Sequence, residues 1–359
     1  MNVGIIGCGG ISNFHFGGYE ATDAKILWCC DIRLEAAQQK AEKYGAKATA
    51  DFMDVINDPD VDVINICAMT NSHNKIIKAA AKAGKKIICE KTLGFDMPDS
   101  LDICKCVEES KVWFATAYMK RYFSAIKMAK EIIKETEATI ISVYARSFQP
   151  WSGLFDIKDP EMIKATNKLI SGHGGGVLVC GGSHILNLLH YFCGLPKTIM
   201  GQMDFPPEGT FDRDANAMIM FENGSVAHFE ACWHEYRKAG FENNGWDERF
   251  EINTDKGQIC FATTLWDHPN NPVQLSYLDA QSGEYTEYRF DVENPFTEEM
   301  IELNDRIKSD RLPRIDHWDG YIVDVMIDTI TKSAKAGKSL DVEWAPEFLA
   351  VKDEHSIGK

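Results

Sequence analysis

The sequence lacks the features that would place it in a membrane or on nucleic acid. No apolar run in its 359 residues approaches the roughly 18 residues that cross a bilayer, and we expect no signal peptide. Basic residues are in the minority, with 38 Lys and Arg against 54 Asp and Glu, and the net charge of -16 repels nucleic acid and anionic lipid. We therefore expect a cytoplasmic protein that binds neither nucleic acid nor membranes.

Cysteines are numerous, but they lack the spacing of metal ligands. None of the 11 belongs to a Cys-x-x-Cys pair, and many lie in apolar runs such as residues 66–68 and 87–89, where a thiol packs as a small apolar group. Cys180 and His184 would supply two ligands of a zinc site, but the sequence offers no third. We expect reduced thiols and no bound metal.

The first third of the chain alternates short apolar runs with amphipathic segments. Helical spacing at residues 34–44 and 74–83 ends at Gly45 and Gly84, residues that commonly terminate helices. The apolar runs predict strands near residues 2–7, 26–31, 62–67, 86–90 and 113–117. Strands that alternate with helices predict a parallel Rossmann sheet, which binds its ligand outside the carboxyl ends of the strands.

Beyond about residue 120 the pattern changes to the alternation typical of half-buried strands. Residues 141–146, 225–230 and 249–252 are interpreted as antiparallel strands. A helical stripe of apolar residues before Gly337 predicts a last helix near residues 317–336, which packs back onto one of the domains. We expect an α/β fold with two domains, residues 1–120 and residues 121–359, and a cleft between them.

A glycine-rich turn follows the first predicted strand and precedes a helix. Gly7 allows a tight turn, Gly9 lets the backbone approach a pyrophosphate, and the helix that begins after Gly10 and Ile11 offers amides to its negative charge. The alternative is that these glycines only connect a strand to a helix.

The end of the second predicted strand bears on the choice of cofactor. Asp31 stands about twenty residues after the glycine turn, where a carboxylate accepts hydrogen bonds from a ribose diol. A carboxylate repels a ribose phosphate and therefore favours NAD. Arg33 lies close enough to weaken that discrimination, so NADP stays an alternative.

Over nearly its whole length the chain resembles the Gfo/Idh/MocA family, the group around glucose-fructose oxidoreductase and inositol dehydrogenase. The matching segments are residues 7–11 with His15, residues 70–73, Glu90-Lys91, residues 174–176 and Gly182-Ser183-His184. The resemblance implies a C-terminal α+β domain with an open, mainly antiparallel sheet, and hydride exchange between a nicotinamide and a sugar or cyclitol carbon. Because an open sheet face can pair with a second copy, we also expect a homo-oligomer, either a dimer or a tetramer.

The resemblance places Glu90 and Lys91 in the cleft, with Lys91 nearest the reacting hydroxyl as acid or base. It also implies that His184 hydrogen-bonds the substrate. In isolation, Lys91 could be a solvated lysine at a strand end, and His184 could be a core histidine.

Other residues that follow predicted strands are weaker candidates for cofactor or substrate contacts. Thr70, Asn71 and His73 could line the nicotinamide side, although capping the next helix explains the short polar side chains equally well. Tyr118 and Arg121 could contact substrate or cofactor, or could join the domains through a salt bridge.

Three residues depart from the family pattern. Cys180 and Asn187 stand where the family has aspartates, which leaves the expected site less acidic. Thr92 follows Lys91 in place of proline, and since a non-proline cis bond costs roughly 2.5–4 kcal/mol, we expect a trans bond there.

These observations favour an NAD-dependent dehydrogenase or reductase of a sugar, glycoside or cyclitol. One alternative is redox-neutral glycoside cleavage by oxidation and elimination on tightly held NAD. Another alternative is a non-catalytic regulator that binds a dinucleotide. Its only support in the sequence is Cys180, which replaces an aspartate of the family pattern.

Overall fold

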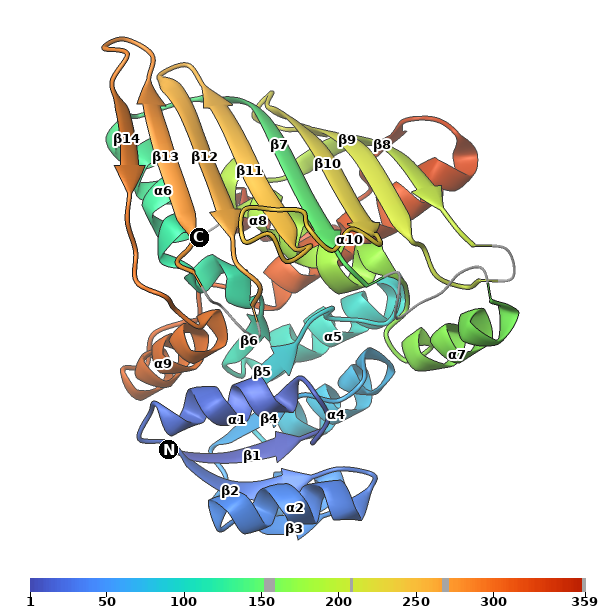
Figure 1. Cartoon of the computed structure of the whole chain (residues 1–359). Helices are drawn as coiled ribbons and strands as arrows, with labels where there is room; N and C mark the ends of the chain where they lie inside the picture. Colours follow the sequence, from blue (N-terminus) through green and yellow to red (C-terminus); the bar gives the residue numbers. More distant parts are fainter. Residues whose placement is uncertain (152–158, 207–208, 267–270, 357–359) are drawn as a thin grey trace. The chain divides into compact units, whose positions relative to one another are not determined.

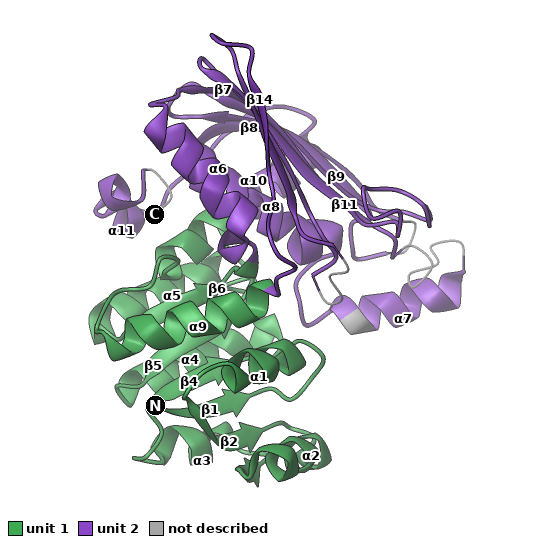
Figure 2. Ribbon diagram, turned by 60° about the vertical axis from the view of Figure 1, so that its left-hand side comes forward, with its two compact units in different colours: residues 1–119, 295–324 green, residues 120–294, 325–359 purple. Residues whose placement is uncertain are grey.

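The computed structural model describes residues 1–151, 159–206, 209–266 and 271–356, and the chain divides into two compact units (Figure 2). Unit 1 comprises residues 1–119 and 295–324. Unit 2 comprises residues 120–294 and 325–359. The sequence did not assign residues 295–324 to the first unit, and each unit is described separately below.

Unit 1 contains a six-stranded parallel sheet in the order β3-β2-β1-β4-β5-β6, which is the Rossmann order (Figure 1). Five strands fall where apolar runs predict them, and the short β3 was not predicted. The strands are β1 (Asn2–Ile6), β2 (Lys25–Cys30), β3 (Lys47–Thr49), β4 (Val63–Ile66), β5 (Lys86–Glu90) and β6 (Phe114–Ala117). The parallel α/β fold predicted for this part of the chain is therefore confirmed.

Helices cross between these strands. They are α1 (Ser12–Glu20), α2 (Leu34–Tyr44), α3 (Phe52–Asn57), α4 (His73–Lys82) and α5 (Met97–Ser110). Their ends follow local chemistry: Asp51 and Asp96 cap α3 and α5, and α2 stops at Gly45 in the left-handed conformation. Side chains of α1 and α2 share one apolar cluster with β1 and β2, whereas α4 packs against α3 and α5.

Helix α9 (Pro295–Lys308) returns to the Rossmann sheet from the far end of the chain. Phe296 stacks on Phe14 of α1 with ring centroids 4.9 Å apart. The helices approach closely at Gly18, where a Cβ atom would lie only 2.6 Å from Met300 Cγ. Glycine at this position therefore lets α9 complete the apolar cluster of unit 1.

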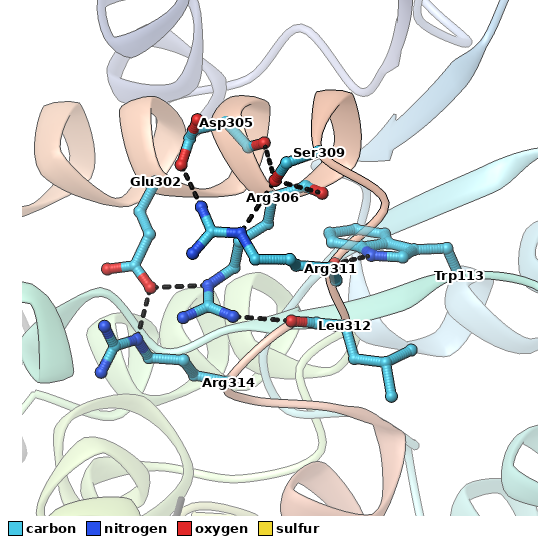
Figure 3. A network of polar contacts seen from close by, with 8 residues as sticks. All are labelled: Trp113, Glu302, Asp305, Arg306, Ser309, Arg311, Leu312 and Arg314. Carbon is cyan, nitrogen blue, oxygen red and sulfur yellow. Dashed lines mark hydrogen bonds and ion pairs between the residues drawn. The ribbon is translucent and has the colours of Figure 1, made fainter.

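A polar network fixes the segment that follows α9 (Figure 3). Glu302 accepts hydrogen bonds from both Arg306 and Arg314. Arg306 also donates to the Leu312 carbonyl at 2.8 Å, and the Trp113 indole donates to the Arg311 carbonyl at 2.9 Å. These contacts tie residues 311–314 to the chain just before β6 and explain why the segment belongs to unit 1.

Unit 2 is built on a nine-stranded sheet in the order β14-β13-β12-β11-β7-β10-β9-β8-β15 (Figure 1). Its strands are β7 (Ile140–Gln149), β8 (Pro196–Asp204), β9 (Asp214–Phe221), β10 (Val226–Trp233), β11 (Asp247–Thr254), β12 (Gly257–Thr263), β13 (Gln274–Asp279), β14 (Tyr285–Tyr288) and β15 (Leu340–Asp341). The sheet is mainly antiparallel, as the family resemblance implies. The interpretation of residues 141–146 and 225–230 as antiparallel strands is wrong for one pair, because β7 and β10 are parallel neighbours.

Unit 2 also contains helices, of which α6 (Ser124–Glu135) and α8 (Ser183–Cys193) pack on one face of this sheet. The others include α7 (Pro160–Ile170) and the short α11 (Pro346–Leu349). Helix α6 packs on β12 and β13, and α8 packs on β7 and β10. The predicted last helix is α10 (His317–Ala336), and the boundary between the units falls within it. None of the helices in the described ranges combines the length and apolarity needed to cross a membrane.

Candidate active site

The glycine turn after β1 has the geometry that the sequence predicts. Gly7 has a φ of +100°, and a Cβ atom there would lie 2.4 Å from the Cys67 carbonyl oxygen. Only glycine fits this position. At Gly9 and Gly10, by contrast, a Cβ atom would meet nothing within 4 Å, so their backbone faces open space. Helix α1 follows at once, and its N-cap residue Ile11 provides no side-chain cap for the first amides.

Asp31 lies directly after β2 with its carboxylate turned toward the glycine turn. Its Oδ2 accepts a hydrogen bond from the Cys8 amide at 2.9 Å, and its Oδ1 accepts one from the Arg33 amide at 2.8 Å. The Arg33 guanidinium is 3.4 Å from Oδ1, and its side chain is 68% exposed. Two backbone amides therefore orient the carboxylate beside the turn, while Arg33 is held only loosely.

The turn after β4 carries three of the predicted residues. Thr70 is buried and Asn71 is exposed within one 3-10 turn. His73 is fully buried, with Nε2 3.1 Å from the Ala68 carbonyl oxygen and Nδ1 3.0 Å from that of Thr92. Burial lowers the pKa of His73. The ring lies between the turn after β4 and the turn after β5, and in its neutral form it donates a hydrogen bond to only one of these carbonyl oxygens.

Glu90 is the last residue of β5, and Lys91 follows it at the same sheet edge. Glu90 is buried, and its Oε2 accepts a hydrogen bond from the Lys91 amide at 3.1 Å. Lys91 is half-buried. The Lys91–Thr92 peptide bond is cis, so the expectation of a trans bond at Thr92 is wrong.

The loop after Lys91 is held from within unit 1. The Gly94 amide donates to Asp324 Oδ2 at 2.9 Å, and a Cβ atom on Gly94 would lie 2.4 Å from the Ser100 amide nitrogen. Together with His73, these contacts define the path of residues 92–94. Tyr118, the other predicted residue of this unit, is buried directly after β6.

In unit 2, the glycine run leads into one π-helical turn (Leu178–Gly182) that continues into α8. Asp212 fixes its start, because its carboxylate accepts hydrogen bonds from the Gly176 amide at 2.8 Å and the Leu178 amide at 2.7 Å. A Cβ atom on Gly176 would lie 2.0 Å from the Asp212 carbonyl oxygen. Glycine at position 176 is thus required by the close approach of Asp212.

Cys180 and His184 lie on this turn and on the first turn of α8, and both are half-buried. Three residues after His184, the buried Asn187 accepts a hydrogen bond from Arg121 Nε at 2.7 Å. The Arg121 guanidinium also lies 4.9 Å from the centroid of the Tyr191 ring. Arg121 therefore contacts α8 through a neutral amide where an aspartate would form an ion pair.

The structure brings the predicted residues together in two groups. Unit 1 holds Gly7, Gly9, Gly10, Ile11, Asp31, Arg33, Thr70, Asn71, His73, Glu90, Lys91 and Tyr118, and unit 2 holds Arg121, Cys180 and His184. Sequence reasoning missed Asp212, Asp324 and Asn65. Asn65 alone left a signal, since it interrupts the apolar run of β4.

Comparison with known proteins places the chain in a family. Residues 1–118 match the model of an oxidoreductase family with an NAD-binding Rossmann fold, and residues 126–260 match that of the GFO/IDH/MocA C-terminal domain. The chain belongs to the GFO/IDH/MocA family. This GFO/IDH/MocA protein is thus an NAD-binding oxidoreductase, which confirms the resemblance, the cofactor and the enzyme class predicted from its sequence.

Relatives of this GFO/IDH/MocA protein include named dehydrogenases. Myo-inositol 2-dehydrogenase of Thermotoga maritima is 25% identical over 357 residues, which cover 96% of this chain and 99% of the relative. Levoglucosan dehydrogenase of Pseudarthrobacter phenanthrenivorans is 28% identical over 299 residues, 73% of each chain. A solved structure of levoglucosan dehydrogenase in complex with NADH matches with a TM-score of 0.83 at 24% identity, over 96% of this chain and 100% of that one, and shows the shared fold.

Proposed function

We propose that this protein is an NAD-dependent dehydrogenase or reductase that acts on a CH–OH group of a sugar, glycoside or cyclitol. The observation that carries the proposal is the sheet edge of unit 1. There the glycine turn, Asp31 and the Glu90-Lys91 pair lie at the carboxyl ends of three strands of one sheet. The names of the inositol and levoglucosan dehydrogenases support the substrate class.

The residues of unit 1 suit a dinucleotide. Gly9 and Gly10 leave a cradle that a side chain would fill, and the first amides of α1 have no side-chain cap, which suits a pyrophosphate. Asp31 is an oriented acceptor for the two ribose hydroxyls, which favours NAD over NADP. When bound, the nicotinamide supplies a site that takes or gives a hydride. We assign Thr70, Asn71 and His73 to its surroundings.

Asp31 also provides the test of cofactor choice. Replacing Asp31 by Ser removes the carboxylate and leaves Arg33 free to meet a ribose phosphate. The ratio of NADH to NADPH affinity, measured by titration of nicotinamide fluorescence, should fall by about tenfold or more, because hydrogen bonds to a charged group contribute about 1.5–3 kcal/mol. An unchanged ratio would remove Asp31 from the ribose site.

The acid–base chemistry is assigned to Lys91 and His184. In the oxidation direction, the neutral Lys91 amine takes the hydroxyl proton while the carbon loses its hydride, and in reduction the ammonium returns that proton. His184 hydrogen-bonds the substrate oxygen and orients it. We assign Cys180, Tyr118 and Arg121 to the substrate side, with Cys180 in the position where a carboxylate would make the site more acidic.

Turnover of a substrate panel tests this proposal. Inositols, sugars and glycosides are offered with NAD and NADP, and Lys91→Ala and His184→Ala are compared with Lys86→Ala at the opposite end of β5. We expect turnover to fall by about 10²-fold or more in the first two variants, the usual contribution of a general acid or base, and to be unchanged in the third. Full turnover in both site variants would refute the assignment.

The same panel separates the redox-neutral alternative. Glycoside cleavage through transient oxidation would release product without accumulation of NADH absorbance, and cofactor would remain bound through purification. Accumulation of NADH in proportion to product supports the dehydrogenase. Dinucleotide binding without turnover of any panel member would favour a regulator.

We further propose that residues 1–120 bind the cofactor, whereas residues 121–359 bind substrate and mediate self-association. We also propose that the protein is located in the cytoplasm. The 11 cysteines all lie in the described residues and form no disulfide, which is consistent with a reducing compartment. Fractionation of cells that express the tagged chain, compared with a known cytosolic marker, checks the location.

The sheet face of unit 2 that lies opposite the helices supports a homo-oligomer. It exposes Tyr144, Met218 and Met220, which are 45–51% exposed, around a depression of about 650 Å³ lined in part by Arg146, Arg249, Glu230 and Glu251. Both signs of charge on one face allow two copies to pair about a two-fold axis. Met218→Asp should reduce the molar mass measured by light scattering, whereas Leu312→Asp, at an exposed leucine of unit 1, should not.

A further inference from the structure

A chain of polar side chains crosses the core of unit 1 and ends at Glu90, the residue before Lys91. His15 of α1, Asn65 of β4 and Glu90 of β5 are each at most 5% exposed. A buried polar group is costly unless a hydrogen bond compensates for lost water. These three buried side chains are therefore expected to hydrogen-bond to one another, and those bonds fix their orientation.

The hydrogen bonds of His15 determine which ring nitrogen carries the proton. Asn65 Nδ2 lies 3.0 Å from His15 Nδ1, and His15 Nε2 lies 2.7 Å from Glu90 Oε1. An amide nitrogen only donates, so Nδ1 must accept. The proton is on Nε2, and His15 donates it to Glu90 as a neutral ring.

The orientation of Asn65 is itself fixed. Its Nδ2 also donates to the Tyr19 hydroxyl at 3.0 Å, and its Oδ1 accepts the Cys67 thiol at 3.6 Å. Exchange of the amide oxygen and nitrogen would place the amide nitrogen opposite that thiol and break both donor contacts. Residues of α1 and β4 thus set the tautomer of His15 before any ligand binds.

Among the described acidic residues around His15, Glu90 is the one whose charged form is stabilised by the hydrogen bonds from His15 and the Lys91 amide. Burial raises the pKa of Glu90, whereas the hydrogen bond from His15 Nε2 to Oε1 and the charge and amide of Lys91 lower it. The groups that face Glu90 are His15, Cys67, His73, Cys89, Lys91 and Glu299.

Burial favours the neutral form of four of these neighbours. Burial raises the pKa of Cys67, Cys89 and Glu299 well above the ordinary values, and burial lowers the pKa of His73. Glu90 therefore faces Lys91 as a single buried negative charge. Its Oε2 accepts the Lys91 amide, so the carboxylate also holds the peptide from which the lysine side chain extends.

We infer that His15 and Asn65 are positioning residues for Lys91, because they hold Glu90 as an ionised carboxylate in one orientation against the Lys91 peptide. The inference rests on the acid–base role proposed above for Lys91. Neither residue is placed in contact with substrate or cofactor, and both act through Glu90.

The first test measures the relay without catalysis. The ¹⁵N chemical shifts of the His15 ring at pH 7.5, assigned by their loss in His15→Gln, should report a neutral ring protonated at Nε2. In Asn65→Leu, which cannot donate to Nδ1, the ring should lose this single tautomer. A charged ring, or a proton on Nδ1 in the wild-type protein, would overturn the inference whether or not any substrate is turned over.

The second test measures the effect on turnover. His15→Leu removes the donor to Glu90, whereas His15→Gln keeps an N–H near the position of Nε2. Loss of a hydrogen bond to a charged group predicts a kcat lower by about tenfold to a hundredfold in His15→Leu, with KM and NADH affinity changed by less than about threefold. The acid-side loss of kcat should also begin about one to two pH units higher, and His15→Gln should restore much of both.

Phe16→Leu is the matched control, since Phe16 is the next buried residue of α1 and stacks on Tyr44 away from the relay. It should lower thermal stability without moving the pH profile. Equal kcat losses and unchanged pH profiles in His15→Leu and Phe16→Leu would reduce His15 to a packing residue. Unaltered turnover in Lys91→Ala would instead refute the proposed function, while the ¹⁵N result would still decide the relay.

Discussion

Replacing Asp324 by Asn should make the stability of the protein less dependent on pH. Asp324 lies in α10, and its Oδ2 accepts a hydrogen bond from the Gly94 amide at 2.9 Å. This contact anchors the loop after Lys91. Burial raises the pKa of Asp324 from 3.8 to about 7, against the lowering effect of the Gly94 amide. A difference of about three pKa units, at about 1.36 kcal/mol each, corresponds to about 4 kcal/mol of folding free energy.

The sign follows from which state binds the proton more tightly. The folded protein protonates Asp324 more readily than the unfolded chain does, so the contribution of this group is complete below about pH 4 and is lost as the pH rises through 7. Asparagine keeps an oxygen for the Gly94 amide and does not titrate. The Asp324→Asn variant should therefore match the wild type near pH 4 and exceed its stability at pH 8 by up to about 4 kcal/mol.

Thermal unfolding midpoints at several pH values between 4.5 and 8.5 provide the measurement. The midpoint of Asp324→Asn should exceed that of the wild type by several degrees at pH 8, and the difference should shrink toward acid pH. Asp328→Asn is the control, since Asp328 lies one turn later in α10 and pairs with Lys332 at 2.7 Å. A constant difference across this range, or a less stable Asp324→Asn variant at pH 8, would refute the reasoning.

Three further predictions concern both units. Asp212→Ala should destabilise unit 2 by about 3 kcal/mol or more, because the Gly176 and Leu178 amides each lose a charged acceptor; differential scanning calorimetry measures the loss, and an effect below about 1 kcal/mol would contradict it. Glu299→Gln should raise the thermal midpoint above pH 7 but not near pH 4, because burial raises the pKa of Glu299 well above its ordinary value and stability is lost as pH rises; an equal gain at both pH values would argue against a buried acid. Cys180→Asp should leave turnover of a polyol equal or higher, and complete loss would show that the thiol has a task of its own.

The architecture of unit 1 was predictable because local patterns and tertiary structure agree. Apolar runs of four to six residues correspond to β1, β2, β4, β5 and β6, since strands covered by helices on both faces need no alternation. The glycine turn was predictable for a steric reason: at Gly7, any side chain would collide with the Cys67 carbonyl. The carboxyl ends of such strands then supplied the candidate residues without knowledge of the contacts.

Other features depend on contacts between distant segments and left little local signal. Strand β3 has three residues, too few for a period to show. The parallel pairing of β7 with β10 joins strands about 80 residues apart, and alternation predicts a half-buried strand but not its neighbour's direction. Helix α9 carries an amphipathic pattern, but its contacts with α1, such as Phe296 on Phe14 and Met300 at Gly18, are what assign it to unit 1.

Polar residues within the core were the hardest to predict and bear most directly on function. An aspartate in a loop, such as Asp212, or in a helix, such as Asp324, has the same local pattern whether it faces water or a buried amide. Burial decides its protonation, and burial is a property of the whole fold. The residues proposed for chemistry are half-exposed and stand out in sequence, whereas the groups that fix their backbone are enclosed. Substitutions at Asp212, Asp324 and His15 should therefore alter the site without removing any group that touches substrate.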